Sequence, residues 1–403
     1  TVDPSVATTI KGSTSFLWDP ADPSVPTIQR DLAPGKIELR RAAVIRGRVL
    51  EADGGAPLGG VSVKVLEDAE YGYTVSRADG RFDLAVNGGA MLTVVYERAG
   101  YLSAHRKVQV PWQDYVSVAD VVLVAQDENV TVIDLEALES AEVAAIARGS
   151  LMPADDAGPR QATMIFQPGT TATLPDEQPL EVISVRATEY THGPDGLARM
   201  PAELPPQSAY TYAVELSVDE VDPETRVQFD PPVAFYLENF LDFPFDSETG
   251  SEDVPMGYYD EASAAWVASE NGRFVRIESV TSGEPDMVNF DLDGDEDCDA
   301  ADVAEYDALG ITPEERAAVA SLVAAESYAV GQVLWRIPVP HFSRWDANWG
   351  FSAPPGAGPC MCSEPDNGDG DPDDPLCGSI IGCQSQTLGE GVGGAGTPLR
   401  LIY

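Results

Sequence analysis

Apolar and polar residues alternate in short runs along residues 42–124. The runs at 42–50 and 60–66 place apolar side chains at every second position, which is typical of half-buried β-strands. Between them, the Gly and Pro residues of EADGGAPLGG favour a turn. Short strands at this spacing predict a small β-sandwich. Its remaining strands are expected at residues 76–86, 91–102 and 116–124.

The alternation continues through a second region, where Pro-rich breaks separate the runs. Residues 137–149 predict a lone helix, and a second helix is predicted from Pro313 to about residue 325. Thr312, Pro313 and Glu315 form a capping box with Pro at the first helical position. We therefore predict a mainly β chain: a β-sandwich, then a second β-rich domain with a short helical insertion. The strands of the second domain are expected at residues 130–135, 160–166, 180–191, 209–218, 231–241, 255–269 and 272–280.

Composition narrows the class of protein. The chain has 403 residues, 43% of them hydrophobic, which suits a globular protein of two or three domains. Its formal net charge is −43, so its field repels nucleic acid and anionic membrane surfaces. No run approaches the roughly 20 apolar residues of a membrane helix. These features predict an extracellular or surface location without membrane insertion, where salt or calcium relieves the self-repulsion.

Residues 291–302, DLDGDEDCDAAD, place six Asp residues in the register of an EF-hand calcium loop. Calcium takes six to eight oxygens at about 2.4 Å, which closely spaced short carboxylates can supply. Position 6, normally a Gly with positive φ, is Glu296, so the turn must carry strain or take a different shape. The alternative is a solvated acidic loop. The predicted ligands are the side chains of Asp291, Asp293, Asp295, Asp299 and Asp302 and the carbonyl of Asp297. The loop resembles those of dockerins and thrombospondin type 3 repeats, in which Asp often completes the coordination.

Four of the five cysteines are crowded near the C-terminal end of the sequence. This clustering favours a disulfide-stapled region outside the cytoplasm, although the spacing does not choose among the three pairings. A zinc site is the alternative. Cys298, inside the acidic loop, is left over. The disulfide candidates are Cys360, Cys362, Cys377 and Cys383.

Aromatic residues concentrate between residues 335 and 351. They fit the core of the second domain, a sugar-binding platform, or a surface that docks on a further domain. The docking candidates are Trp335, Trp345 and Trp349.

The sequence offers little for catalysis. His105, His192 and His341 are far apart and show no metal-ligand spacing. Nucleophile elbows and phosphate-binding glycine loops are missing from the sequence. We therefore predict that the chain is not an enzyme.

The order GRVL, GVSVKV, ADGRFDL, AGYL resembles the transthyretin-like, or carboxypeptidase regulatory-like, domain. Asp79, Gly80, Arg81 and Phe82 correspond to that family's DGxF turn. The resemblance implies a structural and adhesive accessory domain rather than a catalyst, and it covers about a fifth of the chain.

A longer resemblance runs from about Ala33 to the end of the sequence. Segments such as FYLENFLDFPF, VPMGYYDEASAAWV, LGITPEERAAVASL and LWRIPVPHFSRWDANW look like the region ahead of the repeat array in bacterial RHS, or YD-repeat, proteins, an architecture shared with teneurins. The family implies a fibronectin-like plug that closes one end of a YD-repeat β shell, the expected partner, enclosing a C-terminal toxin or effector.

This resemblance predicts five regions and a secreted bacterial cap. The alternative is a calcium-dependent adhesion or carbohydrate-binding module whose partner is a cell-surface glycan or protein. The regions are an extended N-terminal segment (1–41), the transthyretin-like sandwich (42–124), the plug-type domain (125–290), the calcium-type loop with a helix and closing strand (291–345), and a Cys/Gly/Asp-rich segment leading into the shell (346–403).

Overall fold

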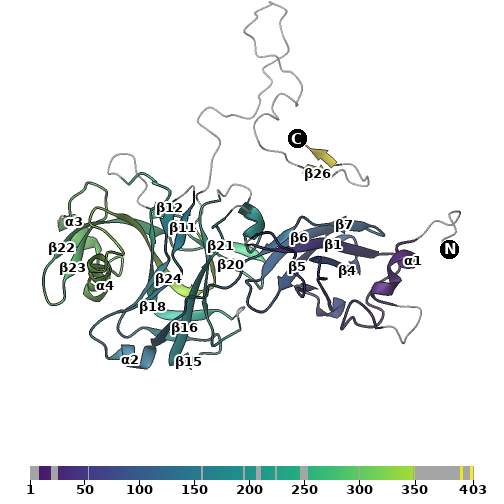
Figure 1. Cartoon of the computed structure of the whole chain (residues 1–403), viewed down its shortest axis with the longest axis horizontal. Helices are drawn as coiled ribbons and strands as arrows, with labels where there is room; N and C mark the ends of the chain where they lie inside the picture. Colours follow the sequence, from purple (N-terminus) through teal and green to yellow (C-terminus); the bar gives the residue numbers. More distant parts are fainter. Residues whose placement is uncertain are drawn as a thin grey trace, which may run out of the picture. The chain divides into compact units, whose positions relative to one another are not determined.

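The chain divides into two compact units, Thr1–Gly350 and Phe351–Tyr403, in a computed structural model of its full length. The structure describes residues 9–349 except 20–25, 53, 156–157, 194–195, 206–209, 223–224, 246–252, 299 and 348, and it also describes 391–393 and 400–402. In the second unit, β26 (Gly391–Gly393) pairs antiparallel with β27 (Arg400–Ile402). Strands dominate the described part of the first unit (Figure 1), so the predicted mainly β class is confirmed.

The N-terminal half of the first unit contains a sandwich of two four-stranded sheets. In one sheet β1 lies between β4 and the parallel strands β7 and β8, and the other has the order β3-β2-β5-β6. The inward side chains, among them Phe82 and Tyr96, form one apolar core. The strands are β1 (Ala42–Glu51), β2 (Ser62–Val65), β3 (Tyr73–Val75), β4 (Arg81–Asn87), β5 (Ala90–Glu97), β6 (Ala104–Val110), β7 (Tyr115–Ser117) and β8 (Val121–Leu123).

The turn before β4 shows why its glycine is needed. Gly80 has φ +76°, and a Cβ there would lie 2.4 Å from the carbonyl oxygen of Val49. Only glycine avoids both the left-handed strain and this contact. The turn therefore lets β4 pair with β1 while Phe82 enters the core.

The described part of the N-terminal segment packs on this sandwich, and residues 10–17 of it are helical where an extended segment was expected. Helix α1 (Ile10–Thr14) is capped by Thr9, and Leu17 and Ile37 are buried in the sandwich core. The buried Gln29 side chain bonds to the backbone of Tyr71 and Ala85. The segment thus supplies hydrogen-bond partners to buried backbone groups of the sandwich, and these contacts hold it in place.

The C-terminal half of the first unit is built on two larger sheets. One follows the order β10-β13-β18-β24-β22-β19, with β14, β15 and β23 attached, and the other the order β21-β20-β25-β17-β16-β9. Apolar side chains from both sheets form a common core. The strands are β9 (Thr131–Asp134), β10 (Ala145–Arg148), β11 (Met152–Asp155), β12 (Gly158–Arg160), β13 (Thr163–Phe166), β14 (Thr171–Thr173), β15 (Pro179–Leu180), β16 (Val182–Glu189), β17 (Ala213–Val218), β18 (Val227–Glu238), β19 (Asp253–Val254), β20 (Gly257–Asp260), β21 (Ala265–Ala268), β22 (Gly272–Thr281), β23 (Met287–Asp291), β24 (Val333–Phe342) and β25 (Arg344–Asp346).

Helix α4 (Pro313–Ala324) begins where the capping box predicts. The Thr312 side chain accepts a hydrogen bond from the Glu315 amide, and the helix packs against β23 (Figure 1). Buried Glu315 accepts hydrogen bonds from Arg336 Nε at 2.6 Å and from the Tyr236 hydroxyl at 2.7 Å. This pairing fixes the helix over a second apolar cluster on the nine-stranded sheet.

The predicted helix at residues 137–149 is wrong over most of its length. Helix α2 (Leu135–Glu139) is a single capped turn, and residues 145–148 form β10 instead. Ile146 pairs with Ile165 of β13, so β10 extends the nine-stranded sheet. Strand pairing and burial therefore outweigh the local helix propensity of these residues, which contributes little free energy per residue.

Candidate functional site

The acidic loop connects a buried strand end to a short helix. Asp291 is the last residue of β23 and is fully buried, and Asp302 lies in the first turn of α3 (Ala300–Glu305) and is 4% exposed. Burying carboxylates is costly unless they are hydrogen-bonded or paired with a cation. The two ends of the loop are therefore the positions where a cation would relieve the greatest cost.

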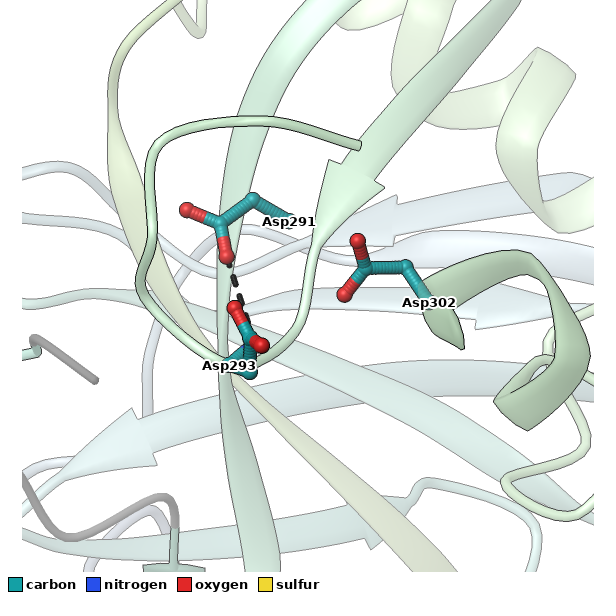
Figure 2. A group of neighbouring side chains, drawn as sticks. All are labelled: Asp291, Asp293 and Asp302. Carbon is teal, nitrogen blue, oxygen red and sulfur yellow. Dashed lines mark hydrogen bonds between the residues drawn. The ribbon is translucent and has the colours of Figure 1, made fainter. Parts of the chain in front are cut away.

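Three of the predicted ligands meet inside the loop (Figure 2). Asp291, Asp293 and Asp302 each offer a carboxylate oxygen, and these atoms lie within 4.8 Å of one another. Oxygens on opposite sides of a calcium ion are about twice the 2.4 Å bond length apart, so the group has the right size for such an ion. The donor set, all oxygen, also suits calcium better than a softer metal.

The structure shows how the loop accommodates Glu296. This residue has φ +74°, the left-handed conformation that glycine usually provides at position 6, and its amide donates to Asp291 Oδ2 at 3.0 Å. The Gly294 amide donates to the other oxygen of Asp291 at 2.6 Å. The turn therefore keeps the EF-hand-like form, and a non-glycine residue carries the strain of that conformation.

The Asp291 carboxylate has a shifted protonation equilibrium. Burial raises its pKa, against the backbone hydrogen bonds from Gly294 and Glu296, which favour the charged form. Arg276 Nη1 lies 3.5 Å from Asp291 Oδ2 and 3.2 Å from Glu296 Oε1, so one guanidinium already offsets part of the charge. A bound cation would favour the charged form further.

The carboxylate of Asp295, another predicted ligand, is not part of this group. Asp293 and Asp295 accept hydrogen bonds from the amides two residues further on, which shapes the loop. The ligand predicted at Asp297 is its backbone carbonyl, which the carboxylate group does not test, so it stays a prediction. Asp299 lies outside the described residues.

The tryptophans proposed for docking lie mostly in the core. Trp335 and Trp345 are 0% and 1% exposed, so neither has surface for a partner. Both belong to the core of the second β region, which was the alternative to docking. Trp349 is half-buried, with its ring 4.3 Å from that of Phe243. Cys298 is a free thiol, 3.5 Å from the Tyr306 hydroxyl. The disulfide candidates Cys360, Cys362, Cys377 and Cys383 lie outside the described residues.

A buried polar network that the sequence did not predict joins the sandwich to the second β region. Arg344 lies at its centre and is 1% exposed: Nε donates to Glu215 Oε2 at 3.0 Å, and Nη2 lies 2.9 Å from Glu261 Oε1. The same Nη2 donates to Ser103 Oγ of the sandwich at 2.6 Å. Burial disfavours the charged guanidinium, but the carboxylates, Glu215 above all, outweigh it and raise the pKa of Arg344.

A histidine completes this contact. His105 Nδ1 lies 3.0 Å from the Tyr259 hydroxyl, and burial, with Arg344 and Arg106 nearby, lowers the pKa of His105 to about 3. Arg106 also donates to the carbonyl of Ala198 at 2.7 Å. Charged residues at inward positions of strands were the one sequence feature that could have drawn attention to this network. The apolar part of the contact consists of Ala52, Leu102, Val122, Val124, Tyr190, Met200 and Ala213.

The fold and this contact define a mainly β, multi-sheet module that begins with a transthyretin-like sandwich. Comparison with known proteins shows which family the sandwich resembles. Residues 37–123 match the family model of the teneurin TTR-like domain. The chain is 47% identical to mouse teneurin-3 over 98 residues, which are 24% of this chain and 4% of that protein. It is 42% identical to chicken teneurin-1 over 109 residues, 27% of this chain and 4% of that protein.

The chain thus aligns with a small fraction of the length of these relatives. Among solved structures, a cohesin–X-dockerin complex of Acetivibrio cellulolyticus covers 21% of this chain and 59% of that chain, at 19% identity and a TM-score of 0.18. None of the helices in the described part of the chain has the length and apolar content needed to cross a bilayer.

Proposed function

We propose that this chain is a non-catalytic structural region of a teneurin-like extracellular protein. Its second β region would be the fibronectin-like plug that closes one end of a YD-repeat shell. In a bacterial RHS protein that shell would enclose a C-terminal toxin or effector. Teneurins are non-enzymatic cell-surface proteins, which supports the assignment to the extracellular space and to a structural role.

The observation that carries the proposal is the buried contact between the teneurin TTR-like sandwich and the second β region. The contact combines the Arg344 network with an apolar cluster, so the two regions form one compact unit rather than independent domains on a linker. A cap needs such rigidity, because a loosely tethered domain would not keep a shell closed.

The test of the cap begins with the coding sequence downstream of Tyr403, where YD repeats are expected. The repeat segment and residues 1–403 are then co-expressed as separate chains, with a tag on one. Co-elution as a single complex in size-exclusion chromatography is the expected result. A gene without YD repeats, or repeats that never co-purify with this chain, would overturn the cap.

We also propose that the acidic loop binds calcium as a structural ion. The three converging carboxylates, two of them buried, support this. Binding to the folded state alone stabilises by about 2.7 kcal/mol when calcium is at a hundred times its Kd. The ion would neutralise repulsion in the loop and connect the end of β23 to α3, without taking part in any reaction.

The measurement is thermal unfolding in EDTA, in millimolar calcium and in millimolar magnesium. Calcium should raise the Tm of the native chain and of Asp307→Asn, an exposed control outside the carboxylate group. The double variant Asp293→Asn, Asp302→Asn keeps similar shapes and should lose the rise. Equal shifts with magnesium, or an undiminished shift in the double variant, would reduce the loop to a solvated acidic turn.

A further inference from the structure

The charge of the chain is distributed unevenly. Residues 37–123 carry ten basic and eleven acidic side chains, a net charge of −1, whereas the whole chain carries −43. The TTR-like sandwich is therefore nearly neutral and holds ten of the 24 basic residues. An anionic partner would meet far less repulsion on the sandwich than elsewhere on this chain.

Four arginines gather on one face of the sandwich. Arg46 and Arg48 of β1 line a shallow cleft of about 530 Å³ together with Arg77, which lies before β4, and Arg81, the first residue of β4. Asp83 and Asp120 also line the cleft. Gly47 lies between the two β1 arginines, so Arg46 and Arg48 project from the same side of the strand.

The carboxylates neutralise only part of this cluster. Asp83 is shared: its Oδ1 lies 3.2 Å from Arg46 Nη2, and its Oδ2 lies 2.8 Å from Arg77 Nη1. Among the residues that the structure describes, Asp79 is the one carboxylate paired with Arg81, at 3.9 Å, and the Arg81 side chain is 68% exposed. Within the described part of the chain, Arg48 has no ion pair. Two guanidinium groups thus keep donors available for a ligand.

The register of the strands makes this arrangement unfavourable for the sandwich alone. Arg48 of β1 lies directly opposite Arg81 of β4. Like charges at directly opposed positions of an antiparallel pair destabilise a sheet. A bound anion between the two side chains would offset this repulsion. The opposed arginines therefore favour binding of an anionic ligand over stability of the free sandwich.

We propose that this cleft binds an extended acidic segment of a partner protein, through carboxylates on Arg48 and Arg81. Directly opposed side chains such as those of Arg48 and Arg81 have Cβ atoms about 4.5 to 5.5 Å apart, and alternate residues of an extended peptide are about 6.6 to 6.8 Å apart on one side of it. Two long arginine side chains can therefore each reach one of two alternate carboxylates. The interleaved Asp83 and Asp120 disfavour a continuous polysulfate, because such a chain would place an anion against each of them. Arginine forks bind carboxylates in a bidentate geometry.

The probe is a fluorescein-labelled peptide of alternating Asp and Ser, twelve residues long, with an Asn-Ser peptide as its neutral counterpart. Binding to residues 1–403 is followed by anisotropy in EDTA, at low salt and at about 0.15 M salt, where the Debye length is about 8 Å. The test variant is Arg48→Gln, Arg81→Gln. The charge-matched control is Arg40→Gln, Arg98→Gln, which lie in the same sandwich but outside the cleft.

The native chain and the control should bind the acidic peptide with affinities within about twofold of each other, and the test variant should bind about tenfold more weakly. Because the variant removes a like-charge pair, its Tm should equal or exceed that of the native chain, which separates lost binding from lost folding. Equal losses in variant and control would mean bulk charge only. Lack of binding by the native chain, or stronger binding of a heparin oligosaccharide, would also overturn the proposal.

Discussion

Removing the Arg344 guanidinium should destabilise the first unit more than removing any exposed cation. In Arg344→Met the side chain keeps its approximate length, but Glu215, which is 3% exposed, loses its ion-pair partner. Arg344 is the one cation paired with Glu215 in the described part of the chain. Breaking a buried pair by deleting one partner costs about 3–5 kcal/mol, because a buried charge is left uncompensated. Lys64→Met is the matched control: Lys64 forms a half-exposed pair with Glu97 at 2.8 Å, and its loss should cost about 1 kcal/mol or less.

Urea unfolding followed by tryptophan fluorescence measures these differences, with Trp345 next to the altered residue in the chain. The pH dependence gives an independent check. Protonation removes the charge of a stranded carboxylate, so the gap between native chain and Arg344→Met should narrow as pH falls from 8 toward 5. The double variant Arg344→Met, Glu215→Gln should recover much of the lost stability. A loss below about 1 kcal/mol, or a gap that does not change with pH, would refute the argument from buried charge.

Two further substitutions test other parts of the fold. Gly72→Ala should lower the free energy of unfolding by about 3 kcal/mol or more, because Gly72 has φ +60° and a Cβ would lie 1.9 Å from the Arg30 carbonyl oxygen. The control is Gly35→Ala, which has φ +79° and open space around the added Cβ. In the same urea assay it should lower the free energy of unfolding by about 1 kcal/mol. Burial lowers the pKa of His341 to about 4, below an unfolded value of about 6.5, so its contribution to stability is complete above pH 6.5 and is lost as pH falls to 4. His341→Gln should therefore reduce the change in the free energy of unfolding between those pH values by on the order of 2 kcal/mol, seen as a flatter plot of Tm against pH. An unchanged slope would contradict this assignment.

Much of the strand pattern could be predicted because one sheet face is buried and the other is not. The predicted run at 42–50 is β1 almost to the residue, and the capping box places the start of α4 correctly. The helix predicted at 137–149 failed because its residues gain more from pairing with β13 than from local helix formation. Local pattern specifies an element well where burial and propensity agree, and poorly where a distant strand decides.

The sites were predictable to different degrees. The acidic loop could be read from sequence because its ligands lie within a dozen residues, although the sequence does not show that three of the six carboxylates converge. The Arg344 network draws on residues 103, 215, 261 and 344, which only the tertiary fold brings together. The arginine cleft depends on the register that sets Arg48 opposite Arg81.

The polar network and the apolar cluster contribute differently to the contact between the two β regions. The apolar cluster is rich in Ala and Val, whose contacts are non-directional and tolerate small rotations of one region against the other. The hydrogen bonds of Arg344 to Glu215 and Ser103 form in one orientation of the two β regions. A different orientation would leave a buried charge without its partner. We infer that the ion pair contributes orientation more than net stability. If so, replacing Arg344, Glu215 and Glu261 together with apolar residues would keep the unit folded while loosening the angle between its two β regions.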